Sequence, residues 1–197
     1  SRRQRQMCIR DRSYTKDQIR EIAEEIGIPV AHKPDSQEIC FIPDHDYARY
    51  IRENTDTELP PGNFVDLDGN ILGKHQGITH YTVGQRKGLN LSMGKPVFVV
   101  EIRPETNEVV IGDSKDVFSD HLTCDHLNWM SVDGLHGETM KVTAKIRYSH
   151  KGAPCEIREI GPDLVEVQFE EPQRAITPGQ AVVFYDGDYV VGGGVIR

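Results

Sequence analysis

The chain has 197 residues, of which 37% are hydrophobic and 27% are charged, a balance typical of a folded globular protein. The formal net charge of -8 disfavours a generally RNA-binding surface, because phosphate contacts need Lys and Arg, although a local basic strip could still bind RNA. No apolar run approaches the roughly 18–20 residues that span a bilayer. The basic N-terminus is not followed by the apolar stretch of a signal peptide. We therefore expect no membrane partner.

The four cysteines, Cys8, Cys40, Cys124 and Cys155, form no CxxC pair, and no Cys/His group has the spacing of a zinc site. So few cysteines in a chain of this size predict neither a disulfide framework nor a bound metal. A reducing, cytoplasmic compartment is the expected location.

Residues 1–12 are basic, and their hydrophobic residues follow no helical or strand period. Such a segment is typical of a disordered or foreign tail, with an RNA-binding arm as the alternative. The segment 15–26 predicts a helix, because Thr15 and Gln18 have the spacing of a capping box. Gly27 then ends it. The apolar side chains at helical spacing, expected on one buried face, are Ile19, Ile22, Ala23 and Ile26.

A second short helix is predicted at 44–53, and the rest of the chain is predicted to be β. Asp68-Gly69 predicts one hairpin, and the runs 96–103 and 108–112 predict another. Gly192–Gly194 predicts a bulge or a close backbone approach. Further strands are expected near 121–129, 139–149, 154–160, 163–170, 181–186 and 189–196. The fold class is therefore mainly β with a short α-helical N-terminal part, a small central α+β domain and a six-stranded C-terminal β-barrel.

Cys40 is the main candidate for covalent chemistry, because it follows the polar turn at 34–36. A thiol acts as a nucleophile or sulfur carrier only as the thiolate. Its position between Ile39 and Phe41 is also typical of a small core residue, and spacing alone favours this second interpretation. Cys124 and Cys155 lie in strand-like stretches and are predicted to be packing residues.

Two segments could contact nucleic acid. The loop 76–88 is rich in glycine, amides and hydroxyls and carries adjacent cations, so it could meet phosphate or be a plain β-connection. The segment 141–149 alternates, which predicts a strand. Its apolar face is Val142, Ala144, Ile146 and Tyr148. Its outer ridge, either an RNA contact or a solvated face, is Lys141, Thr143, Lys145, Arg147 and Ser149.

Several long motifs resemble the tRNA-specific 2-thiouridylases. They are, in the order of that family, PDSQEICFIPDHDYARYI, GKHQGITHYTVGQRKGL, GKPVFVVEIRPETNEVVIG, KIRY and ITPGQAVVFY. The resemblance covers about residues 13–197 and overturns the core interpretation of Cys40. It implies that 1–12 is a tail outside the family, 13–43 the end of an ATP-pyrophosphatase domain, 44–113 a central domain and 114–197 the barrel.

The resemblance also implies site residues and partners. Cys40 would become a persulfide, accepting sulfur from a cysteine desulfurase or a relay protein and passing it to C2 of the adenylated wobble uridine of tRNA. ATP is the family's cofactor. Family tRNA contacts fall on Arg147, Tyr148 and Gln180, and to these we add Gln85, Arg86, Lys87 and Lys145 from the basic loop and ridge.

The chain departs from the family in having no SGGxDS-type pyrophosphate loop and no first catalytic cysteine, since the surroundings of Cys8 do not match. We therefore expect no ATP site in these residues and no thiolation by this chain alone. Three hypotheses follow: part of the enzyme with Cys40 as sulfur carrier, a non-catalytic tRNA-binding barrel, or a structural barrel without an RNA role.

Overall fold

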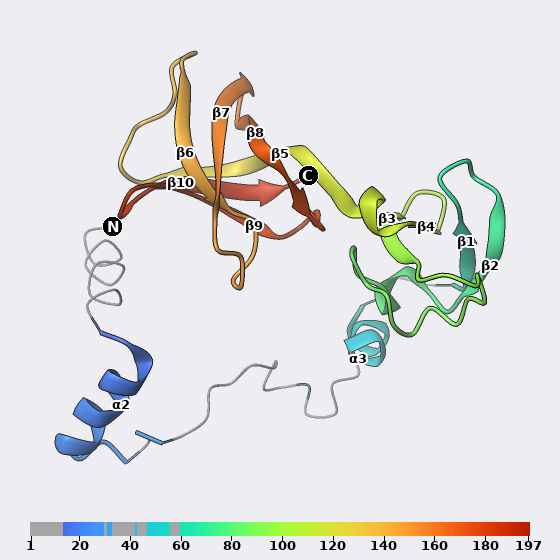
Figure 1. The fold of residues 1–197 in the computed structure, drawn as a ribbon, viewed down its shortest axis with the longest axis horizontal. Helices are drawn as coiled ribbons and strands as arrows, with labels where there is room; N and C mark the ends of the chain where they lie inside the picture. The colour runs from blue at the N-terminus through green and yellow to red at the C-terminus, as the bar shows by residue number, and fades with distance from the viewer. Residues whose placement is uncertain (1–13, 30, 33–41, 43–46, 56–59) are drawn as a thin grey trace. The chain divides into compact units, whose positions relative to one another are not determined.

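A computed structural model describes residues 14–29, 31–32, 42, 47–55 and 60–197. The chain divides into two compact units, Ser1–Asp46 and Tyr47–Arg197 (Figure 1). The predicted sulfur carrier, Cys40, and the tail 1–12 lie outside the described residues.

Helix α2, Lys16–Glu25, lies in the first unit and begins as predicted. The Gln18 amide donates to Thr15 Oγ1 at 3.4 Å, and the Thr15 amide donates to Gln18 Oε1 at 2.8 Å, which completes the capping box. The predicted burial of its apolar face is wrong for the described residues, because Ile19, Ile22 and Ile26 are all exposed. The periodicity identified the apolar face, but nothing in the described part of this unit covers it.

The second unit opens with helix α3, Tyr47–Asn54, followed by a four-stranded sheet. Its strands are β1 (Gly62–Val65), β2 (Ile71–His75), β3 (Phe98–Arg103) and β4 (Glu108–Gly112). Both predicted hairpins are confirmed, since β1 pairs with β2 and β3 with β4, each antiparallel. The order β2-β1-β4-β3 joins them through a parallel pairing of β1 with β4.

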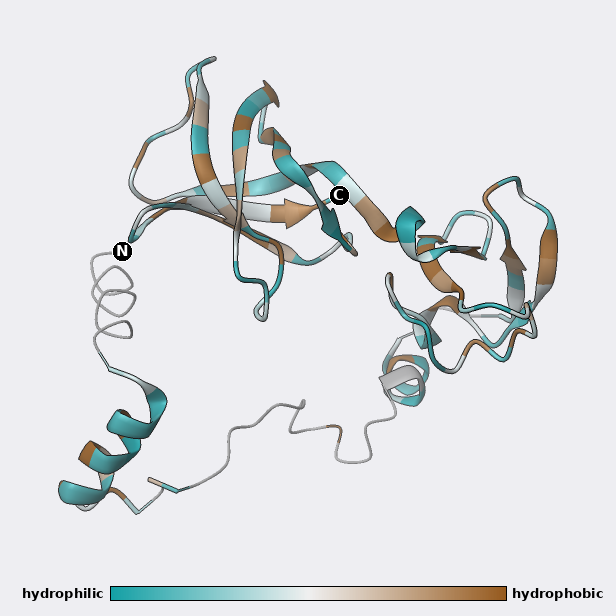
Figure 2. Ribbon diagram, in the orientation of Figure 1, coloured by the Kyte–Doolittle hydropathy of each residue, from teal (hydrophilic) through white to brown (hydrophobic). Residues whose placement is uncertain are grey.

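The six remaining strands close into an antiparallel barrel in the order β10-β5-β8-β7-β6-β9. Hydrophobic and hydrophilic residues alternate along these strands (Figure 2), and the buried hydrophobic ones form the core of the barrel, the pattern of a filled barrel. The fold class predicted from the sequence is therefore confirmed. The strands are β5 (Phe118–Trp129), β6 (Thr139–Lys145), β7 (Ala153–Gly161), β8 (Leu164–Arg174), β9 (Ala181–Asp186) and β10 (Tyr189–Ile196).

The glycines of β10 allow two neighbouring strands to approach closely. The pairing of β10 shifts register against both β5 and β9, as the predicted bulge requires. A Cβ on Gly193 would lie 2.3 Å from Val182 O, and one on Gly194 would lie 2.5 Å from Asp125 O. No larger residue fits there without moving backbone atoms.

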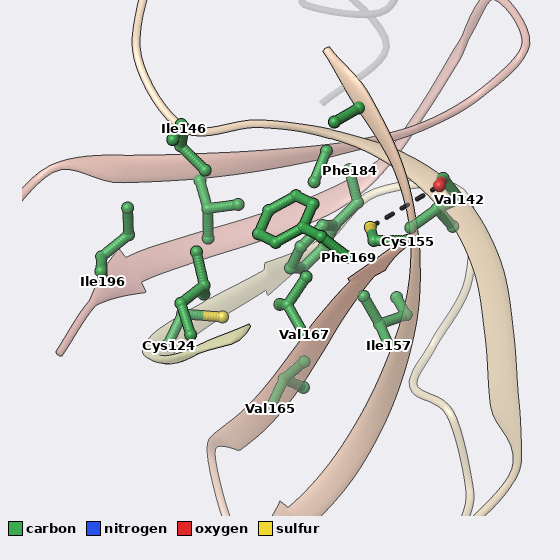
Figure 3. Packing of buried hydrophobic residues seen from close by; sticks show 14 of the residues in the cluster. Cys124, Val142, Ile146, Cys155, Ile157, Val165, Val167, Phe169, Phe184 and Ile196 are labelled. Carbon is green, nitrogen blue, oxygen red and sulfur yellow. Dashed lines mark hydrogen bonds between the residues drawn. The ribbon is translucent and has the colours of Figure 1, made fainter. Parts of the chain in front are cut away.

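Cys124 and Cys155 lie in the barrel core, as predicted (Figure 3). Burial raises the pKa of each thiol to about 12, and Cys155 Sγ donates to Val142 O at 3.6 Å. Both are therefore protonated, packed thiols at neutral pH. Among the described residues, no helix has the length and apolar character needed to cross a membrane.

Candidate nucleic-acid interface

A groove of about 690 Å³ lies on the outer side of the barrel. It is formed by β6, by β9 and by the turn that follows β6. The groove brings together four of the predicted RNA contacts, Lys145, Arg147, Tyr148 and Gln180. Its other lining residues are Ser149, Ala181, Val183 and Tyr185.

The turn at the end of β6 decides how the motif KIRY is displayed. Val142, Ala144 and Ile146 are buried as the alternation predicts. The strand ends at Lys145, however, rather than near residue 149, and the His150 amide closes a turn on Arg147 O at 3.1 Å. The alternation therefore fails after Ile146.

The turn places the side chain of Tyr148 in solvent. Tyr148 was expected on the apolar face with Ile146, and that prediction is wrong, because its side chain is fully exposed, at 102% of its reference area. A fully exposed aromatic ring gains nothing from burial in the folded chain. It is available instead to stack on a flat ligand.

Arg147 is half-buried and held by the barrel. Its Nη1 donates to the main-chain oxygens of Arg174 at 2.9 Å and Ala175 at 3.4 Å. Hydrogen bonds from a charged donor are strong, so the guanidinium has a fixed place in the groove instead of moving freely on an outer ridge.

The floor of the groove combines apolar surface with positive charge. Lys145 pairs across strands with Val183, and its Nζ lies 5.6 Å from the centre of the Tyr185 ring. The lining residues include two cations, Lys145 and Arg147, and no carboxylate. The groove is thus a locally positive surface on a chain whose net charge is -8.

Gln180 also lines the groove. Its main chain is fixed, because its N–H donates to Thr177 O at 3.3 Å and its carbonyl accepts from Ile196 N at 2.8 Å. The side chain is exposed and makes no hydrogen bond to the described part of the chain. Its amide can therefore both donate and accept toward a ligand.

The predicted contacts Gln85, Arg86 and Lys87 lie in the loop 82–88 and do not line this groove. The Gln85 side chain accepts from Thr82 N at 2.9 Å and donates to Lys87 O at 3.0 Å. Its own carbonyl accepts from Val99 N at 2.9 Å. Gln85 therefore shapes the loop, whereas Arg86 and Lys87 are its exposed cations.

Sequence reasoning missed two residues of this region. Tyr185 lies on the outward face of β9 with Ala181 and Val183, and the alternation of 181–186 could have indicated it. Arg174 donates from Nη2 to Gly84 O at 3.2 Å. The two residues are 90 positions apart, so no local sequence pattern predicts this contact.

The described residues contain no group of three or more His, Cys, Asp or Glu side chains that could hold a metal. The segment around Cys40 is described only at Ile42, which is buried.

Comparison with known proteins gives three family matches in chain order. Residues 5–44 match a tRNA methyl transferase HUP domain, 49–113 a tRNA methyl transferase PRC-barrel domain, and 119–196 an aminomethyltransferase beta-barrel domain.

Whole-sequence relatives agree with these matches. Proteins named tRNA-specific 2-thiouridylase MnmA are 61% identical in Lachnoclostridium phytofermentans, 58% in Acetivibrio thermocellus and 53% in Clostridioides difficile. The aligned regions cover 93%, 94% and 93% of this chain, respectively, and 51% of each relative. The chain thus spans about half the length of the curated relatives it matches.

Proposed function

Because this chain belongs to the family of tRNA-specific 2-thiouridylases, we propose that it forms the tRNA-holding and sulfur-carrying part of such an enzyme. The reaction is transfer of persulfide sulfur to C2 of the adenylated wobble uridine of tRNA. The whole enzyme uses ATP and works in the cytoplasm. A cysteine desulfurase or a sulfur-relay protein supplies the sulfur.

The groove on the barrel is the observation that supports RNA binding. RNA is held by cations that meet phosphate and by exposed aromatic rings that stack on unpaired bases. The groove offers both, with Lys145 and Arg147 as cations and Tyr148 as an exposed ring. Gln180 adds an amide that can read a base edge or a 2′-hydroxyl.

The state of the cysteines supports Cys40 as the sulfur carrier. Cys124 and Cys155 are buried, and their raised pKa of about 12 removes them as thiolates at neutral pH. Of the other two, only Cys40 lies in a motif resembling the family's.

In the proposed transfer, the terminal sulfur of the Cys40 persulfide attacks C2, and AMP leaves with the C2 oxygen. A second thiol then cleaves the S–S bond, which frees 2-thiouridine and leaves Cys40 in a disulfide. The 197 residues contain no SGGxDS motif to bind the pyrophosphate of ATP, so we propose that this chain does not adenylate tRNA by itself.

The binding part of the proposal is tested by titrating the chain with bulk tRNA at several salt concentrations. Lys145→Ala is expected to weaken binding and lower the slope of log affinity against log salt by about 1. The matched control is Arg158→Ala, which removes one exposed cation of β7. Arg158 pairs with Thr139 at the start of β6, whereas Lys145 lies at the end of that strand. Salt-independent binding, or equal effects of the two variants, would contradict an RNA role for the groove.

A non-catalytic tRNA-binding barrel is the second candidate, because the groove lies wholly on the barrel and does not involve Cys40. The two candidates differ at the thiol. If Cys40 carries sulfur, incubation with a desulfurase and cysteine should add one sulfur atom, about 32 Da by mass spectrometry, as the thiol becomes a persulfide. Cys40→Ser should abolish the addition. Unchanged mass with intact tRNA binding would favour the non-catalytic barrel.

A further inference from the structure

Two basic surfaces of the second unit are joined through one residue, Arg174. The first is the groove with Lys145 and Arg147, and the second is the loop 82–88 with Arg86 and Lys87. The sequence places them about 60 residues apart, yet Arg174 contacts the main chain of the loop and is contacted by Arg147. We call this set the sheet–barrel contact; its residues are Gly84, Phe98, Arg147, Arg174 and Ala175.

Arg174 makes its contacts with opposite ends. Its guanidinium donates to Gly84 O at 3.2 Å and lies over the Phe98 ring with Cζ 5.6 Å from the ring centre. Its carbonyl accepts from Arg147 Nη1 at 2.9 Å. A planar guanidinium can hydrogen-bond at its edge while its face lies on an aromatic ring, and a lysine ammonium cannot do both in the same way.

The loop also fits closely against the barrel at Gly84. This residue has φ +85°, and a Cβ on it would lie 2.7 Å from the Cβ of Ala175. Ala175 is itself in the left-handed region, with φ 55°, and its amide donates to Val117 O at 2.7 Å. Both main chains are therefore fixed where they touch.

We infer that Arg174 is a positioning residue that holds the loop 82–88 and the groove in one arrangement, so that both surfaces bind a single RNA together. This inference rests on the proposed tRNA-binding function. Arg174 acts through Gly84 and Arg147 and does not itself touch the RNA. Two sites held at a fixed spacing bind a rigid ligand more tightly than the same sites on parts that move independently, because the second contact follows the first at high effective concentration.

The first test measures the contact without RNA. Hydrogen exchange is followed in the peptides that cover 82–88 and 146–150 in the wild type, Arg174→Ala and Arg158→Ala. Arg174→Ala should accelerate exchange in the peptide 82–88 by about fivefold or more, because Gly84 O loses its side-chain donor. The peptide 146–150 should change little, because Arg147 bonds the main-chain oxygen of residue 174, which the variant keeps. Arg158→Ala removes the same charge away from the contact and should change neither. Unchanged exchange in the peptide 82–88 of Arg174→Ala would overturn the inference, whatever the outcome of RNA binding.

The second test asks how the contact affects RNA binding. Arg174→Ala should weaken binding of bulk tRNA about fivefold to tenfold and lower the salt slope, because the cations of the loop no longer bind together with the groove. Lys87→Ala in the otherwise wild-type chain should lower the slope by about 1. In the Arg174→Ala background, Lys87→Ala should cost less than about twofold, because the loop no longer binds together with the groove. Additive losses of affinity in the double variant would make Arg174 an independent phosphate ligand and overturn the positioning role.

Gly84→Ala reaches the same contact from the other side without removing a charge. It should reproduce the loss of affinity and the faster exchange, with an unfolding transition that stays cooperative. Arg174→Lys keeps the charge but not the planar group, and it should remain impaired. Full tRNA affinity in Gly84→Ala or in Arg174→Lys would contradict the inference. Absence of salt-dependent tRNA binding in the wild type would instead refute the proposed function. The exchange test would still show whether Arg174 holds the loop.

Discussion

His75 donates a hydrogen bond from Nε2 to Asn107 O at 3.1 Å, and this bond fixes which ring nitrogen holds the proton. The other nitrogen, Nδ1, lies 3.0 Å from the amide of Gly77, which can only donate, so Nδ1 must accept. The ring is therefore neutral. It is also buried, and it packs edge-on against Phe64 and Tyr81.

This arrangement predicts a loss of stability in mild acid. Burial lowers the pKa of His75 below 6.5, because a charged ring loses hydration and a second proton on Nδ1 would face the Gly77 N–H. The unfolded chain then binds more protons than the folded one below about pH 6.5, so the free energy of unfolding falls as pH drops through the lowered pKa. Urea unfolding at a series of pH values from about 5 to about 8 measures this slope.

The matched variant for that prediction is His75→Gln, which cannot titrate. It should be less stable than wild type at neutral pH but should show a smaller fall toward acid. Exposed His126 and His136 have a raised pKa from their neighbouring aspartates, Asp125 and Asp133, and act in the opposite direction in both proteins. An identical pH slope in the two proteins would show that His75 is not the group responsible.

Tyr148→Ala should separate RNA binding from stability. Because its side chain is fully exposed, the substitution should change the unfolding midpoint little. If Tyr148 stacks on a base, binding of tRNA should weaken by about 1–3 kcal/mol, as seen for base–aromatic stacking. Tyr148→Phe keeps the ring and should retain most of the affinity. Equal losses in both variants would point to the hydroxyl rather than to stacking.

Gly193→Ala should destabilise the barrel strongly. The new methyl group would overlap Val182 O, a main-chain atom that cannot move without breaking the β9–β10 pairing. We expect a loss of about 3 kcal/mol or more in the free energy of unfolding, measured in urea. Gly161→Ala is the control, because its Cβ would meet the Leu164 side chain at an ordinary 3.8 Å. Similar stability of the two variants would mean that β10 can move away from β9.

Thiol labelling should distinguish the cysteines by burial. Cys124 and Cys155 should resist iodoacetamide in the native chain at about pH 8, since their pKa of about 12 leaves almost no thiolate. Both should react once urea unfolds the barrel. Peptide mass spectrometry locates the label, and rapid native labelling of either residue would show that the barrel opens readily.

The sequence predicted features that depend on neighbours in the chain. The Thr15–Gln18 capping box and the hairpin at Asp68-Gly69 are confirmed because a few adjacent residues determine their geometry. The inward face of β6 was predicted as far as Ile146 for the same reason. The exposure of Tyr148 was not, because the turn after the strand reverses the pattern.

Features that depend on distant residues escaped prediction. The parallel pairing of β1 with β4 joins two hairpins separated by a long connection, and nothing in either hairpin specifies it. The link from Arg147 through Arg174 to Gly84 likewise needs three segments to meet in space. The role of Cys40 and the tRNA contacts at Arg147, Tyr148 and Gln180 came from resemblance to a family. The added contacts came from the basic loop and ridge, and all of these remain predictions.

The closure of the barrel depends on its last strand, β10. Strand β10 lies between β5, the first barrel strand in the sequence, and β9, so neither edge is satisfied until β10 is in place. The Ile196 amide that fixes Gln180 also belongs to β10. A closed barrel therefore fixes Gln180 at the groove, and an RNA bound there would stabilise the closed barrel relative to the open one.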